Sequence, residues 1–184
     1  KFRELRKAGA AEKFDAQQWR AQAEMGWAGV IVPEAQGGVG MGWLALGVVL
    51  EQLGRTLAAS PLSATSAAAG AILLSDHDAL KDEVLPRLAR GEAVATLAIN
   101  ESARFDPSRC ETRVQDGKLT GVKLFVAEGD AATLFVVSAQ DGLYLVDDGE
   151  GVTKSSRSMV DFRSHADVRF DGAPARKLGG VELI

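Results

Sequence analysis

Hydrophobic residues recur at helical spacing through the first half of the chain. Trp43–Leu57 carries apolar side chains three or four positions apart, which form one stripe and predict a buried helix. Ser63–Leu74 is so rich in alanine that it can pack closely on several neighbours, so we expect a central bundle helix. Asp78–Ala89 predicts a further helix, which Pro86 should kink or divide because proline lacks an N–H. The stripe consists of Leu46, Val49, Leu50, Leu53 and Leu57.

The chain before these helices carries start and stop signals. Asp15 suits the N-cap of a helix over Asp15–Met25, and Gly26 suits its end. The apolar run Gly29–Val32 leads into a proline and a glycine-rich loop, whose backbone freedom argues against a regular element. The first half therefore predicts a helical bundle that ends near Gly91.

From Ala93 onward the hydrophobic period changes to that of β-strands. Two hairpins are indicated, one around Asp116-Gly117 and one around Gln140-Asp141-Gly142. About seven short strands without crossover helices are typical of a small antiparallel barrel or sandwich. The fold class is therefore α+β and multidomain, with a helical domain over residues 1–92 and a β-domain over residues 93–184. The predicted strands are Val94–Ile99, Thr112–Gln115, Lys118–Val126, Leu134–Ser138, Leu143–Val146, 152–157 and 166–170.

Composition narrows the range of partners. The 184 residues are 46% hydrophobic and 25% charged, as in ordinary globular proteins. The net charge of −4, with 21 scattered Lys and Arg residues, argues against a nucleic-acid partner. The apolar stretches are too short for a membrane span, and Lys1–Glu4 does not open a signal peptide. Cys110 is the only cysteine, which excludes an intramolecular disulfide and favours a reducing, cytoplasmic location.

Several familiar motifs are incomplete. Gly40–Ala45 fits the G-x-G-x-x-A dinucleotide pattern, but no second strand with an acidic end follows. His77 and His165 lack partners at ligand spacing, so we expect no metal site. Cys110, beside an arginine, could be an activated thiol, but we favour a packed structural cysteine in a strand. Asp147–Glu150 lacks the ligand spacing of an EF-hand and suits an exposed acidic turn.

Five short blocks follow one pattern along the chain. Val32–Met41 has the form V-P-E-x-x-G-G-x-G, Glu51–Arg55 reads E-Q-L-G-R, and Leu85–Glu92 reads L-P-R-L-A-R-G-E. Ala98–Ser102 reads A-I-N-E-S, and Gly121–Ala127 reads G-V-K-L-F-V-A. Together these blocks resemble the acyl-CoA dehydrogenase family, which has V-P-E-x-x-G-G-x-G, E-E-L-x-R, L-P-x-L-x-x-G-E, A-L-T-E-P and G-x-K-x-W-I-T/S in that order.

The resemblance implies a helical N-terminal domain, a middle β-domain and a C-terminal four-helix domain that is absent from this chain. The lack of an initiating methionine likewise suggests a trimmed chain or fragment, whose exposed apolar face should remain where that domain packs. The implied activity is FAD-dependent oxidation of an acyl-CoA thioester to its α,β-enoyl-CoA, in fatty acid or steroid degradation. Because the family's carboxylate base lies in the C-terminal domain, we expect no catalytic residue here. The implied partners are the acyl-CoA, electron-transfer flavoprotein or a similar acceptor, and further subunits, identical or unlike.

A cofactor site follows from the same resemblance. Asn100 replaces a family threonine and keeps donor and acceptor atoms, whereas Ala127 replaces a hydroxyl residue and offers no side-chain hydrogen bond. Phe125 keeps an aromatic wall but lacks the indole N–H of the family tryptophan. The residues implied to line the flavin are Leu97, Ile99, Asn100, Phe125, Val126 and Ala127.

The segment after this block departs from the family. Ala103–Asp106 stands where the family has G-x-G-S-D, so we assign substrate contacts to Ser102 and to Arg104, which could meet a phosphate by charge. Glu101 and Glu128 are expected to be structural carboxylates. These departures leave two other functions open: a partner subunit of a heteromeric acyl-CoA dehydrogenase that binds no flavin, and a binding module for CoA esters without a redox role.

Overall fold

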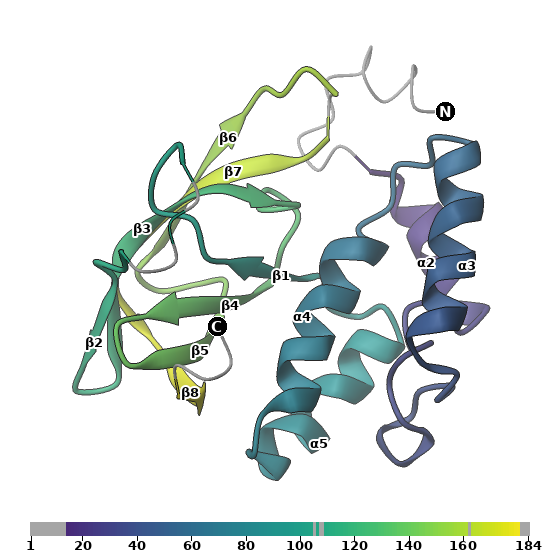
Figure 1. Ribbon diagram of the computed structural model, residues 1–184, viewed down its shortest axis with the longest axis horizontal. Coiled ribbons are helices and arrows are strands. Elements are labelled where there is room, and N and C mark those ends of the chain that lie inside the picture. Colours follow the sequence, from purple (N-terminus) through teal and green to yellow (C-terminus); the bar gives the residue numbers. More distant parts are fainter. Residues whose placement is uncertain (1–13, 105, 107–108, 162, 181–184) are drawn as a thin grey trace.

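The computed structural model describes residues 14–104, 106, 109–161 and 163–180. The outer ends of both predicted domains, residues 1–13 and 181–184, lie outside this part. Helices gather on one side of the molecule and strands on the other (Figure 1). The helices are α2 (Ala16–Glu24), η1 (Glu34–Gln36), α3 (Gly42–Arg55), α4 (Leu62–Leu74) and α5 (Asp78–Ala89). The strands are β1 (Ala95–Ala98), β2 (Arg113–Gln115), β3 (Lys118–Ala127), β4 (Leu134–Ala139), β5 (Gly142–Asp147), β6 (Val152–Arg157), β7 (His165–Pro174) and β8 (Arg176–Gly179).

Local signals set the limits of the first helix as predicted. The Asp15 carboxylate accepts hydrogen bonds from the main-chain N–H groups of Gln17 and Gln18 at 3.0 Å, which satisfies two free donors at the start of α2. Gly26, with φ of +80°, follows the helix end in the left-handed region. The alanine-rich α4 packs on both α5 and β1, which confirms its central place.

Helix α3 corrects one expectation, because it is not a buried helix. Leu46 is its only buried side chain, whereas Leu44 is 85% and Val48 is 55% exposed. The apolar stripe covers one face, and no element of the described chain packs on the opposite face, so α3 forms the outer edge of the molecule (Figure 1). Leu57, counted in the stripe, lies beyond the helix end with φ of +49° and is 71% exposed.

Pro86 does not divide its helix. Helix α5 continues from Asp78 to Ala89 with Pro86 inside it. The carbonyl that loses its helical partner belongs to Asp82, four residues earlier, and Asp82 is exposed. The missing bond therefore belongs to a residue on the exposed side of the helix.

Two four-stranded sheets form the β-part. One has the order β1-β4-β5-β8, with β1 parallel to β4, and the other is antiparallel with the order β2-β3-β7-β6. Both predicted hairpins are confirmed, and the architecture is an α+β arrangement as expected. The described residues form eight strands rather than about seven. Strand β8 escaped notice because Arg176–Gly179 is short and buries only Leu178.

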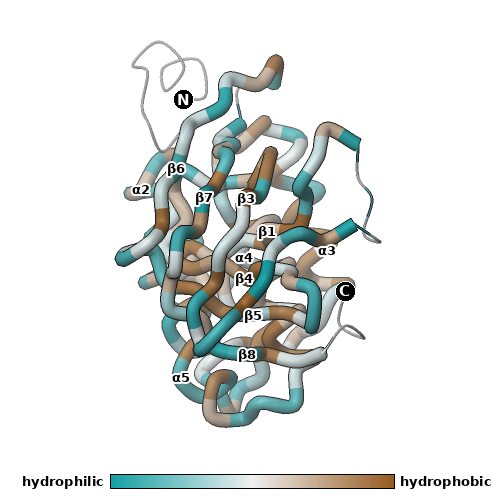
Figure 2. The backbone as a smooth tube through the Cα atoms, turned by 90° about the vertical axis from the view of Figure 1, so that its left-hand side faces the viewer, coloured by the Kyte–Doolittle hydropathy of each residue, from teal (hydrophilic) through white to brown (hydrophobic). Residues whose placement is uncertain are grey.

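The core has two layers, one on each face of the first sheet. Leu134 and Val136 on β4 pack toward the helices, whereas Phe135 and Val137 pack toward the second sheet. The ring of Phe135 meets Phe170 edge to face, with centroids 5.8 Å apart. Figure 2 shows hydrophobic stretches mainly in the middle of the molecule and hydrophilic ones mostly at its edges. The helices and the first sheet therefore share one core, and the division into two domains stays a prediction.

Candidate functional site

Strand β1 and the residues just after it lie beside the last part of β3, with the two segments running in opposite directions. The Leu124 N–H donates to the carbonyl of Asn100 at 2.7 Å, and the Thr96 hydroxyl donates to the carbonyl of Ala127 at 2.6 Å. These two bonds join the segments that the family resemblance implies as the two flanks of a flavin. The structure therefore brings the two segments together, although they are far apart in the sequence.

A bulge shapes the β3 segment. Lys123 pairs with Val168 and Val126 pairs with Ala166, so two β3 residues lie opposite Asp167 alone. One of the two is Phe125, whose φ of +54° is unusual for an aromatic residue. Its N–H, turned out of the ladder, donates to the Asp167 carboxylate at 3.1 Å. The bulge therefore takes Phe125 out of the regular ladder, one residue after Leu124, which bonds to Asn100.

Arg157 of β6 contributes to the same corner, which is the place where residues 96–100 meet the last part of β3. Its guanidinium contacts the Asp167 carboxylate at 2.5 Å and lies 4.2 Å from the centre of the Phe125 ring. The hydrogen bond from Arg157 is the main reason that the pKa of Asp167 is lowered. One face of the Phe125 ring is therefore covered by a cation, which fixes the ring in place.

The residues assigned to the flavin differ in their access to a ligand. Leu97, Ile99 and Asn100 are half-buried, and Ala127 is exposed. Val126 is 2% exposed and belongs to the core between the sheets. Its side chain cannot line a ligand site, so any contact from Val126 would come from its main chain.

The two residues assigned to the substrate lie on an exposed loop after β1. Ser102 and Arg104 are both exposed, and the Ser102 hydroxyl donates to the carbonyl of Arg104 at 2.5 Å. Phe105, which follows, lies outside the described residues. Arg104 is therefore free to meet solvent or a ligand, and the loop itself is tied to the strands through Glu101.

A buried ion pair under this loop escaped the sequence analysis. Lys123 is fully buried, and its ammonium donates to the Glu101 carboxylate at 2.6 Å. Burial alone would raise the pKa of Glu101, but hydrogen bonds from Lys123, Thr112 and the Glu111 N–H outweigh it and lower this pKa to about 2. The sequence did contain a signal for this pair: Lys123 stands at an inward position of an alternating strand. A buried lysine requires a partner.

Cys110 lies beside this pair and is not activated. It precedes β2 rather than lying in a strand, and its thiol contacts the Glu101 carboxylate at 3.4 Å. Burial is the main reason that its thiol pKa is raised, although the Lys123 charge acts against this. A raised pKa lowers the fraction of thiolate, which is the nucleophilic form.

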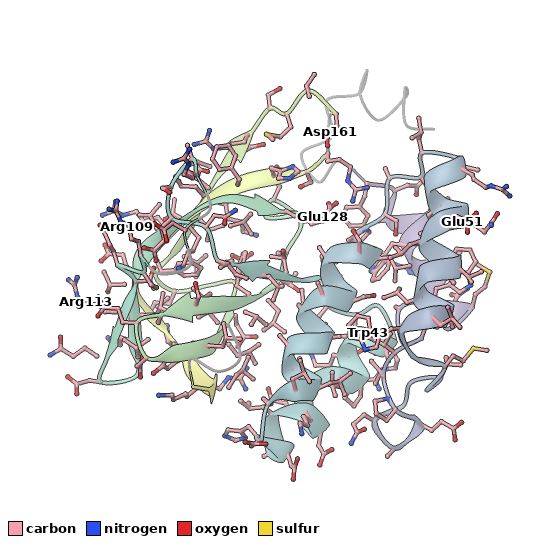
Figure 3. All side chains as sticks on the ribbon, viewed as in Figure 1. Trp43, Glu51, Arg109, Arg113, Glu128 and Asp161 are labelled. Carbon is pink, nitrogen blue, oxygen red and sulfur yellow. The ribbon has the colours of Figure 1, made fainter. Side chains whose placement is uncertain are left out.

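A second ion pair, between a half-buried arginine and a buried glutamate, adjoins an apolar cavity. The Arg163 guanidinium donates to the Glu128 carboxylate at 2.7 Å and to the carbonyl of Ser60 at 3.3 Å. The Glu128 side chain is only 4% exposed. Figure 3 places Glu128 between the strands and α3, with Asp161 above it. The cavity, of about 510 Å³, is lined by Leu50, Leu53, Gly54, Leu57, Ala58, Ala59, Ser60, Leu62, Ser63, Asp161 and Arg163.

The Glu128 carboxyl should make stability depend on pH. Burial raises its pKa from 4.5 to about 7, although Arg163 acts in the opposite direction. Since the folded chain then holds this proton more tightly than the unfolded chain, stability should fall as pH rises from 4.5 to 7, by at most about 3 kcal/mol. Glu128→Gln, which resembles the protonated form, should remove this fall.

Urea unfolding at pH 5 and pH 8 measures the effect. Glu51→Gln, a change of the same kind at an exposed site on α3, is the matched control and should follow the unmodified protein. An equal loss of stability in Glu128→Gln and the unmodified protein would show that another group is responsible.

The part of the chain that the structure describes contains neither a cluster of metal-ligating side chains nor a membrane-spanning helix. Among these residues, no three His, Cys, Asp or Glu side chains gather where they could hold a metal ion. Nor does any helix within the described ranges have the length and apolar character needed to cross a bilayer. Gly40–Ala45 opens α3 after a series of turns rather than after a strand, so it lacks the context of a dinucleotide fold.

Comparison with known proteins agrees with this arrangement. Residues 3–92 match the acyl-CoA dehydrogenase N-terminal domain. Acyl-CoA dehydrogenase FadE28 of Mycobacterium tuberculosis (strain ATCC 25618 / H37Rv) is 33% identical over 129 residues, which cover 70% of this chain and 38% of that protein. The Tcur3481-Tcur3483 steroid ACAD G363A variant is similar with a TM-score of 0.88 and 32% identity, over 99% of this chain and 52% of that one.

The solved ChsE4-ChsE5 complex from Mycobacterium tuberculosis gives a TM-score of 0.87 and 28% identity, over 98% of this chain and 52% of that one. The chain thus spans about half the length of these solved chains and a smaller share of FadE28. Sequence blocks, fold and these likenesses agree: the chain belongs to the acyl-CoA dehydrogenase family.

Proposed function

We propose that this chain forms part of the FAD and acyl-CoA site of an acyl-CoA dehydrogenase, which oxidises an acyl-CoA thioester to its α,β-enoyl-CoA. The observation that carries the proposal is the contact between residues 96–100 and the last part of β3, through the Leu124–Asn100 and Thr96–Ala127 hydrogen bonds of 2.7 and 2.6 Å. Members of the family use FAD. In the oxidation, the α-proton goes to a base, hydride leaves the β-carbon, and a carbon–carbon double bond forms.

The residues at this corner suit a flavin ring, which has an apolar edge and a polar edge. Leu97, Ile99 and the ring of Phe125 offer apolar surface, and the Asn100 amide can donate and accept hydrogen bonds. Exposed Ala127 leaves room for the ring but contributes no hydroxyl. FAD, when bound, would supply the acceptor for the hydride. We assign no catalytic base within residues 1–184.

The apolar cavity supports a site for the acyl group. It adjoins the corner because Arg163, on its wall, pairs with Glu128, the residue after Ala127. At about 510 Å³ it lies within the usual range for ligand sites, and its lining is mostly aliphatic. We propose a bulky apolar acyl group, and a steroid-derived one is consistent with the likeness to a steroid ACAD.

A second candidate is a partner subunit that binds no flavin. The hydroxyl that the family offers at position 127 is absent, and position 125 lacks an indole N–H. A similar solved structure is a ChsE4-ChsE5 complex, which makes assembly with an unlike chain a natural alternative. In that case the exposed face of α3 and the corner at Asn100 would complete a neighbour's site rather than this chain's own.

The flavin content separates these functions. We would purify the full-length protein with any partner chain that accompanies it, and record the visible spectrum and flavin per chain before and after anaerobic addition of acyl-CoAs. One flavin per chain that acyl-CoA bleaches is the expected result. No flavin on this chain despite added FAD, with flavin on a partner, would replace the proposal by the partner-subunit function. Acyl-CoA binding without flavin on any chain would leave a CoA-ester binding module.

A further inference from the structure

We propose that Glu101 and Lys123 are positioning residues, whose buried ion pair holds the main chain around Asn100 in the geometry that binds FAD. This inference rests on the proposed function. Neither side chain is assigned a contact with the cofactor. Both act through the segment between β1 and the exposed loop, which carries Ile99 and Asn100.

Lys123 fixes the residue before Asn100. Its ammonium has three hydrogen-bond donors, and it reaches the Glu101 carboxylate at 2.6 Å, the Ser138 hydroxyl at 2.9 Å and the carbonyl of Ile99 at 3.3 Å. The last of these bonds goes to the main chain at the assigned flavin edge. A buried lysine on β3 therefore sets the position of a peptide group in the neighbouring segment.

Glu101, the residue after Asn100, is held in place by its own side chain. One carboxylate oxygen accepts from the hydroxyl of Thr112 at 2.6 Å and from its N–H at 3.0 Å, and the other accepts from the Glu111 N–H at 2.5 Å. These donors precede β2, so the carboxylate ties the segment to the opposite side of the loop. The residues on both sides of Asn100 are thus fixed by hydrogen bonds. The carbonyl of Asn100 itself accepts the Leu124 N–H at 2.7 Å.

Stability alone is a weak reason for such a pair. Removing a lysine from water is costly, and well-packed apolar residues in place of a buried ion pair often give equal or greater stability. What apolar side chains cannot supply is the set of directed bonds to the Ile99 carbonyl and to the N–H groups of Glu111 and Thr112. The pair therefore suits a role in fixing geometry, at the place where the flavin edge is assigned.

The test uses the full-length protein and separates positioning from folding. In Glu101→Leu/Lys123→Met both charges are replaced by apolar side chains, so neither is left buried without its partner. We expect this variant to keep a cooperative thermal transition but to bind FAD at least about tenfold more weakly, equivalent to about 1.4 kcal/mol. We also expect its flavin spectrum to lose fine structure. Glu101→Gln, which keeps the shape of the side chain, should weaken binding in the same direction if the double variant does not fold.

A second ion pair, between β6 and the residue after β5, provides the control. Lys154 and Asp148 form an ion pair with 2.7 Å between ammonium and carboxylate, and the ammonium also donates to the carbonyls of Asp130 and Ala132. Asp148→Leu/Lys154→Met should leave FAD affinity within about twofold, a change below 0.5 kcal/mol. FAD affinity and spectrum unchanged in a folded Glu101→Leu/Lys123→Met would overturn the positioning role and leave the proposed function standing. Failure of the unmodified protein to bind FAD would instead overturn the proposed function, and this inference with it.

Discussion

Replacing Phe135 by alanine is expected to lower the free energy of unfolding by about 3–5 kcal/mol. Phe135 is completely buried between the two sheets, and its ring meets Phe170 edge to face. Removing the ring loses its burial and leaves a cavity between two sheets that are each held by main-chain hydrogen bonds and can close only partly. Urea unfolding at constant pH measures the loss.

Leu74→Ala is the control for this change. Leu74 is 72% exposed at the end of α4, so its truncation should change the free energy of unfolding by less than about 0.5 kcal/mol. A loss below about 1 kcal/mol in Phe135→Ala would mean that the two sheets do not enclose a packed core there, since such losses are typical of surface sites.

Gly38→Ala is expected to lower the free energy of unfolding by about 3 kcal/mol, at the upper end of the usual cost of overpacking. A Cβ on Gly38 would lie 2.1 Å from the carbonyl oxygen of Val32. That carbonyl cannot move aside easily, because Val32 is completely buried and its oxygen accepts the Gly40 N–H at 2.9 Å. The tight turn explains why this part of the family motif requires glycine.

Gly47→Ala provides the opposite control. Gly47 lies in α3 with open space where a Cβ would stand, so alanine should stabilise the chain by about 0.5–1 kcal/mol through its higher helix propensity. Thermal or urea unfolding of the two variants should therefore move in opposite directions. Equal effects of the two substitutions would contradict the close approach of Gly38 to Val32.

Elements with strong local signals could be predicted from the sequence. Asp15 marks the start of α2 because its carboxylate can reach two free N–H groups, and Asp116-Gly117 marks a hairpin because both residues adopt positive φ, +50° and +71°. The adjacency of residues 96–100 and 124–127 was reached through the family resemblance. No local pattern contains it, because it depends on β1 and β3 meeting across the fold.

What could not be predicted depends on tertiary contacts. The exposure of Leu44 and Val48 on α3 depends on which neighbours are present, and periodicity measures only how apolar residues are spaced. The bulge at Phe125 arises from pairing with β7, and the side chain of Asp167 supplies the acceptor that the ladder no longer provides. The pairing of Lys123 with Glu101 likewise joins residues on two different segments.

Amide hydrogen exchange on addition of FAD tests most directly whether the β1 end and the β3 bulge form one flavin site. We expect FAD to slow exchange in residues 97–102 and 124–128 of the full-length protein together, and to leave the hairpin at Asp116-Gly117 unchanged. Slower exchange at Gly40–Ala45, or in only one of the two segments, would contradict a flavin site at this corner.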